Sequence, residues 1–170
     1  MTIAALNTPR DMALKLFREA GRAWTAEDAE SAADHLLNFC ITNSALRDWV
    51  LQHQGHLKRS VAFEKWRSGA KGYFGECADM ANVIKHFESR KKIAVLTDVL
   101  ETRVALGPFG PIEGSERSHP SFEIVLSNDE KVDLLQFLHQ ICTVWEEIFR
   151  ADQTLGDLPF YGYSMTANLK

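Results

Sequence analysis

The sequence of 170 residues is poor in cysteine, and its three cysteines lie far apart, at positions 40, 77 and 142. An odd number of cysteines without short paired spacing argues against a disulfide framework and against a zinc ribbon. Each cysteine lies among apolar residues of an expected helix. The pattern therefore predicts buried thiols with a structural role, because free cysteine behaves as a small hydrophobic residue.

The sequence also lacks an excess of positive charge and a long hydrophobic run. Its formal net charge of -4 argues against a broadly basic nucleic-acid surface, so RNA is a partner that the net charge does not favour. No stretch of about 20 apolar residues is present, and Arg10-Asp11 interrupts the N-terminal region. We expect a cytoplasmic protein with neither a secretory signal nor a membrane-spanning segment.

Several sequence motifs of enzymes are absent. The chain has no glycine-rich phosphate loop, no dinucleotide fingerprint after a strand and no Gly-x-Ser-x-Gly elbow. None of the expected helices carries a Glu-x-x-His pair, which helical di-iron bundles use to hold their metals. The sequence thus gives no reason to expect a cofactor, and the metal interpretation is the weakest one.

What is present is a strong helical pattern. A hydrophobic content of 45% and a charged content of 25% are typical of one globular domain, expected over residues 1–170. Capping residues and apolar periodicity predict a first helix that Gly21 ends and a long second helix that ends near Gly55. Further helices are predicted over about 58–68 and 76–90 and after a capping box at Ser127–Glu130.

Between the fourth predicted helix and the last one, the period of the hydrophobic pattern changes. Residues 93–104 are rich in β-branched side chains and predict a strand, and Phe122–Leu126 predicts its return after a loop rich in glycine and proline. The expected fold class is therefore α+β. It consists of a bundle of four or five helices with an antiparallel β-hairpin at about 93–126, inserted before the last helix.

The most informative segment carries a polar row inside an apolar helix. Asp79, Asn82 and His86 stand at i, i+3 and i+7, which places them within about 60° of arc on one helix face. A carboxylate, an amide and an imidazole on one face are suited to acid/base chemistry, to a metal or to a structural polar seam. We take these three as the candidate catalytic residues.

A similar row, His35, Asn38 and Thr42, lies on the long helix. If the two rows face each other, His35 and His86 share a pocket, and Asp34, Asp48 or Asp79 orients a ring nitrogen. The alternative is a seam of hydrogen bonds that fixes the register of the helices. The candidate binding residues are His35, Asn38, Asp48 and Lys85.

The residues Asn82-Val83-Ile84-Lys85-His86 resemble the Asn-x-x-x-His part of the motif in HEPN domains, a helical family of bacterial defence and toxin systems. The arginine that precedes the histidine in that family is replaced here by Met80. The resemblance implies a four-helix core and dimerisation across the motif helices. It also implies either metal-independent RNA cleavage that uses His86 and Asn82 or a noncatalytic role in recognition.

Taken together, the residues and the resemblance favour a noncatalytic interaction or ligand-recognition domain of bacterial defence or toxin type. Its expected partners are another protein or a second copy of the chain. Two alternatives stay open. One is a ribonuclease of HEPN type that uses His86 as acid or base, and the other is a small-molecule or metal enzyme with its site inside the bundle.

Overall fold

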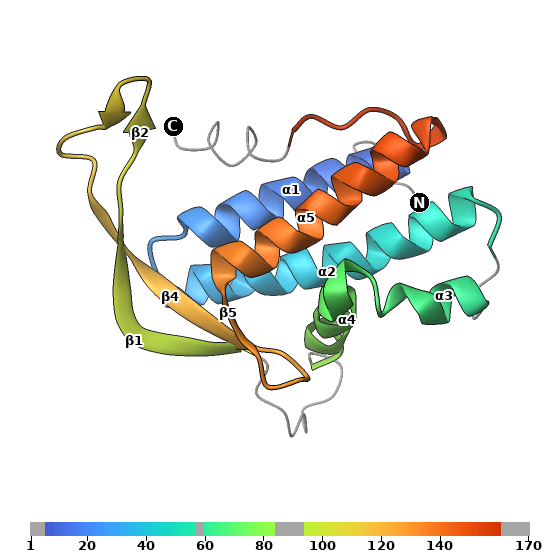
Figure 1. Cartoon of the computed structure of the whole chain (residues 1–170), viewed down its shortest axis with the longest axis horizontal. Coiled ribbons are helices and arrows are strands. Elements are labelled where there is room, and N and C mark those ends of the chain that lie inside the picture. Colours follow the sequence, from blue (N-terminus) through green and yellow to red (C-terminus); the bar gives the residue numbers. More distant parts are fainter. Residues whose placement is uncertain (1–5, 57–59, 84–93, 161–170) are drawn as a thin grey trace.

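The computed structural model describes residues 6–56, 60–83 and 94–160. These residues confirm the expected α+β class, a helical bundle with an antiparallel hairpin inserted before its last helix (Figure 1). The α-helices among the described residues are α1 (Pro9–Thr25), α2 (Ala29–His53), α3 (Val61–Trp66), α4 (Tyr73–Val83) and α5 (Leu134–Ala151). Short 3₁₀ turns at Ala70–Gly72 and Gln153–Leu155 precede α4 and follow α5.

The first two helices form an antiparallel pair whose starts follow the capping residues of the sequence. Thr8 accepts a hydrogen bond from the backbone N–H of Asp11, and the Asp11 carboxylate bonds back to the backbone of Thr8. Asp28 caps α2 in a similar way. The expected end at Gly21 is wrong, because Gly21 is buried and α1 continues to Thr25. A helical glycine costs only about 1 kcal/mol, and tertiary packing offsets it here.

The core lies between α1, α2, α4 and α5 and centres on Trp145. This side chain of α5 is fully buried, and its Nε1–H donates to Oδ1 of Asn43 on α2 at 2.8 Å. Trp66 stacks on Phe74 with ring centroids 4.6 Å apart, and both rings contact Trp145. Aromatic packing therefore joins α3 and α4 to α5.

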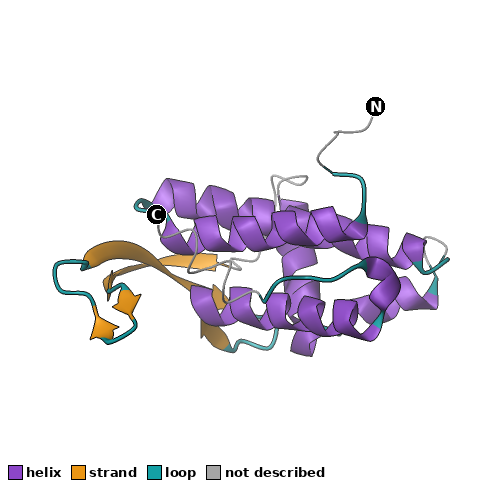
Figure 2. Ribbon diagram, turned by 90° about the horizontal axis from the view of Figure 1, so that it is seen from above, coloured by secondary structure: helices purple, strands orange, loops and turns teal. Residues whose placement is uncertain are grey.

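The inserted hairpin pairs β1 (Ala94–Arg103) with β4 (Arg117–Val125) in antiparallel register, and β5 (Lys131–Asp133) adds to the other edge of β4. A second small ribbon, β2 (Leu106–Gly107) and β3 (Gly110–Pro111), forms the tip. The strands lie at one end of the helices, and the tip points away from them (Figures 1 and 2). The hairpin thus leaves the bundle as a projecting element.

The capping box predicted at Ser127–Glu130 does not start the last helix. Instead, these residues form a turn in which the Leu126 N–H donates to the Glu130 carbonyl oxygen. The chain then pairs with β4 as β5, and Asp133 caps α5 by accepting from the backbone N–H of Gln136. Helix α5 begins at Leu134 because the strand pairing takes precedence over the local capping pattern.

The predicted state of the cysteines is confirmed, since Cys40, Cys77 and Cys142 are all free and buried. Among the described helices, none is both long and apolar enough to cross a membrane.

The bond between Asn43 and Trp145 makes a prediction for stability. Replacing Asn43 with alanine leaves the buried indole N–H without its acceptor, which costs about 1–3 kcal/mol of unfolding free energy. Urea unfolding, followed by tryptophan fluorescence, measures this loss. The matched control is Asn38→Ala, an exposed position on the same helix, where we expect a change within about 0.5 kcal/mol. Equal effects at the two positions would contradict the assigned role of Asn43.

Candidate functional site

The ring of His35 is oriented by a carboxylate from α1. Its Nδ1 lies 3.0 Å from Oε2 of Glu19, so Nδ1–H donates to the carboxylate. At this nitrogen of His35, Glu19 of the neighbouring helix therefore takes the place that Asp34, Asp48 or Asp79 was expected to fill; the same expectation for His86 lies outside the described residues.

Glu19 is the centre of a charged cluster. Its side chain is only 7% exposed, and its Oε1 lies 3.0 Å from Arg22 and 3.6 Å from Lys15. Burial raises the pKa of Glu19, but the hydrogen bond from His35 and the charges of Lys15 and Arg22 together bring it below its ordinary value. The carboxylate is ionised at neutral pH, and the Lys15 ammonium also donates to Thr42 on α2 at 2.7 Å.

This cluster resembles a structural seam more than a reaction centre. The Glu19 carboxylate interacts with three basic side chains, and the bonds from His35 and Lys15 cross between α1 and α2. The residues that sequence reasoning missed are Lys15, Glu19 and Arg22. Their spacing of i, i+4 and i+7 on α1 was the available signal, since it places them on one helix face.

Asp79 lies in a different ion pair, between α4 and the end of α3. Its Oδ1 accepts from the Arg67 guanidinium at 2.7 Å, and both side chains are nearly half exposed. Asn82, one turn further along α4, is exposed as well. Met80, at the position of the family's arginine, is instead buried, with its sulfur 3.8 Å from Sγ of Cys40. Arg67 therefore brings a cation to the polar row from another segment.

The other predicted binding residues do not join either cluster. Asn38 is exposed on α2, and Asp48 pairs with its neighbour Arg47 at 2.8 Å. Lys85 and His86 lie outside the described residues. Within the described part of the chain, His35 and Asp79 thus belong to separate ion pairs, and the pocket expected between His35 and His86 stays a prediction.

Apolar side chains are exposed on the projecting hairpin. We call residues 104–116, which include β2 and β3, the arm. Phe109 at the turn of the arm is fully exposed, and Ile112 and Val104 are 50% and 39% exposed. Most large apolar residues elsewhere are buried in the core, so this gathering on one short ribbon is unusual for a surface that stays in water.

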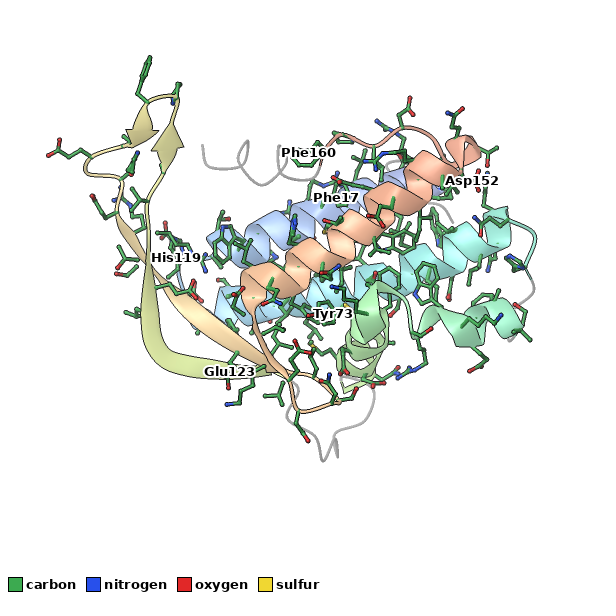
Figure 3. All side chains as sticks on the ribbon, in the orientation of Figure 1. Phe17, Tyr73, His119, Glu123, Asp152 and Phe160 are labelled. Carbon is green, nitrogen blue, oxygen red and sulfur yellow. The ribbon has the colours of Figure 1, made fainter. Side chains whose placement is uncertain are left out.

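The base of the arm is fixed to the end of α1 and to the turn that follows it. The Arg103 guanidinium lies over the ring of Trp24, 3.2 Å from its centroid, and donates to the Trp24 carbonyl oxygen. On the opposite strand, His119 donates from Nδ1 to the carbonyl oxygen of Ala26 at 2.8 Å. His119 lies where the hairpin meets the helices (Figure 3). These contacts fix the direction in which the arm extends from the bundle.

Two further features bear on ligand binding. A cleft of about 320 Å³ lies between α5 and the segment after it, lined by Glu146, Phe149, Arg150 and residues 157–160. Over residues 6–56, 60–83 and 94–160, no group of three or more His, Cys, Asp or Glu side chains is placed to hold a metal ion. The cleft lies apart from the predicted residues His35 and Asp79, neither of which lines it.

The charged cluster predicts a pH-dependent contribution to stability. Because the folded-state pKa of Glu19 lies below its ordinary value of 4.5, ionised Glu19 stabilises the fold at higher pH, and this contribution is lost as pH falls through the lowered pKa. We expect Glu19→Gln to lose roughly 1–3 kcal/mol of unfolding free energy at pH 7 and progressively less below pH 4.5. Urea unfolding from pH 3 to 7 measures this difference, with the exposed Glu27→Gln as control. A difference independent of pH would contradict the assignment.

Comparison with known proteins gives no relative for this chain: no family profile, no curated protein and no solved structure matches it significantly. The geometry of the described residues therefore carries the functional argument.

Proposed function

We propose that this chain is a noncatalytic interaction domain that binds a partner protein through its arm, residues 104–116. The observation that carries the proposal is the full exposure of Phe109 at the turn of a ribbon that points away from the bundle. The assignment to bacterial defence or toxin systems rests on the resemblance of Asn82 and His86 alone.

The contrast between the arm and the polar clusters supports this proposal. His35, Glu19 and Lys15 interact with one another or with Thr42, and Asp79 is bound by Arg67. The arm instead displays apolar surface to solvent. Large exposed aromatic residues are the usual anchors of protein interfaces, because burying them in a partner's pocket releases water from a wide apolar area.

The composition of the arm indicates the chemistry of its partner. Residues 104–116 include two exposed carboxylates, Glu113 and Glu116, and no lysine or arginine. A complementary surface has an apolar pocket for Phe109 and a basic rim for the two carboxylates. We therefore expect weaker association at higher salt concentration, since screening affects the rim and leaves the apolar contact intact.

The test of this proposal replaces Phe109 with serine. Because the side chain is fully exposed, we expect the unfolding free energy to change by less than about 0.5 kcal/mol while partner binding falls at least tenfold. A photoreactive phenylalanine analogue at position 109 identifies the partner by cross-linking in cells. Affinity for that purified partner is then measured for the wild type and for Phe109→Ser by calorimetry.

The matched control is Val61→Ser, which removes another exposed apolar side chain, on α3, the helix that lies at the opposite end of the molecule from the hairpin in Figure 1. Val61→Ser should keep wild-type affinity. The proposal fails if the analogue at position 109 gives no discrete cross-linked protein, or if Phe109→Ser binds the captured protein as tightly as the wild type does.

One observation favours a second candidate, a metal-independent ribonuclease of HEPN type. The cation that the family supplies from the position of Met80 is offered here by Arg67, whose guanidinium contacts Asp79 in the polar row. In such a reaction the 2′-hydroxyl attacks the adjacent phosphate, His86 acts as acid or base, and a cation stabilises the developing negative charge. Arg67 is exposed enough to reach a phosphate.

The ribonuclease candidate predicts that Arg67→Gln lowers RNA cleavage by about 100-fold or more, the usual effect of losing one charge-stabilising group. The fold should persist, because an exposed ion pair contributes at most about 1 kcal/mol. Cleavage of single-stranded RNA and tRNA, with and without EDTA, is measured for the wild type, Arg67→Gln and His86→Ala. Lys65→Gln, an exposed cation on α3, serves as the control.

The two candidates give different outcomes in this assay. The ribonuclease is supported if the wild type and Lys65→Gln cleave RNA in the presence of EDTA. Arg67→Gln and His86→Ala must also have lost this activity. Absence of cleavage by the folded wild type rules out the ribonuclease.

A further inference from the structure

The three cysteines of the chain come from three different helices, yet their sulfur atoms gather in one part of the core. The thiol of Cys77 on α4 donates to Sγ of Cys40 on α2, with the two sulfurs 3.5 Å apart. Sδ of Met80, also on α4, lies 3.8 Å from Sγ of Cys40. Cys142 on α5 is near enough to contribute to the electrostatics of Cys77. All three thiols are fully buried.

The pair Cys40 and Cys77 is close to the geometry of a covalent bond. A disulfide bond is about 2.05 Å long, so the two sulfurs need to approach by about 1.5 Å. Helices α2 and α4 already pack against each other, so the two cysteines meet across an interface that the fold has formed.

We propose that Cys40 and Cys77 form an intramolecular disulfide between α2 and α4 when the protein meets a peroxide oxidant. A thiolate attacks one peroxide oxygen, the O–O bond breaks, and a sulfenic acid and one water molecule result. The second thiol then attacks the sulfenic sulfur, the S–S bond forms, and a second water molecule leaves. Two thiols lose two electrons and two protons, and one hydrogen peroxide becomes two waters.

Because both thiols are buried, the reaction requires a local opening of the packing between α2 and α4. Two effects raise the pKa of the Cys77 thiol well above its ordinary value: the larger is desolvation in the apolar core, and the next is the hydrogen bond with Cys40. The closed form therefore holds almost no reactive thiolate. Peroxide reaches the pair when α4 separates locally from α2. The disulfide persists after the two helices close again, because it links α2 to α4 covalently.

The disulfide would act on the surface that carries the polar row. Helix α4 holds Asp79 and Asn82 on its outer side and Cys77 on its inner side. A covalent link from Cys77 to α2 restricts how far α4 can move, and with it the position of Asp79 relative to Arg67. This inference is independent of the proposed function of the arm, since it involves no residue of the hairpin.

The test is oxidation of the native protein with hydrogen peroxide, followed by mass spectrometry and thiol counting after denaturation. We expect the intact mass to fall by two hydrogens, the free thiols to fall from three to one, and peptide mapping to join Cys40 to Cys77. The melting temperature should rise by several degrees, because the link shortens the accessible chain in the unfolded state.

Single-cysteine variants distinguish the Cys40–Cys77 disulfide from a disulfide that includes Cys142. Cys142→Ser is the matched control and should still form the bond, whereas Cys40→Ser and Cys77→Ser should keep both remaining thiols reduced. Each variant is first checked for a cooperative unfolding transition. The proposal is overturned if the native wild type keeps three free thiols, if the bond includes Cys142, or if peroxide yields only sulfinic acid.

Discussion

The fold depends on the burial of Trp145. Its indole lies between three segments that the chain brings together from far apart: α2, which supplies the acceptor Asn43, and α3 and α4, which supply the rings of Trp66 and Phe74. A buried indole N–H requires a hydrogen-bond acceptor, and Asn43 is almost completely buried at the matching position. The direction of α5 across α2 is therefore constrained by a specific bond as well as by apolar packing.

The sequence was sufficient to predict the class of the fold and the insertion of the hairpin before the last helix. Apolar periodicity and the caps at Thr8 and Asp28 marked the helices, and β-branched residues after position 93 marked the hairpin, because these signals are local. The errors arose where tertiary contacts override a local signal. Gly21 is tolerated within α1 because packing covers it, and the turn at Ser127–Glu130 is followed by a strand because β4 offers an edge to pair with.

The candidate site was less predictable, because helix periodicity gives the face of a residue but not its partner. Sequence reasoning recognised His35 and Asp79 as polar residues with a function in packing or chemistry. It did not find Glu19 or Arg67, which lie 16 and 12 residues away from them along the chain. The exposed arm was visible only as a loop rich in glycine and proline, and the contacts of Arg103 and His119 at its base with Trp24 and Ala26 had no local signature.

Asp133 occupies two structural roles at once. It is the last residue of β5, paired opposite Glu123, and it is also the N-cap whose carboxylate receives the first N–H bond of α5. The sheet and the helix are therefore joined without a single intervening linker residue. A displacement of the hairpin cannot be absorbed at this joint, so it is passed directly to the first turn of α5, the helix that carries Trp145 into the core.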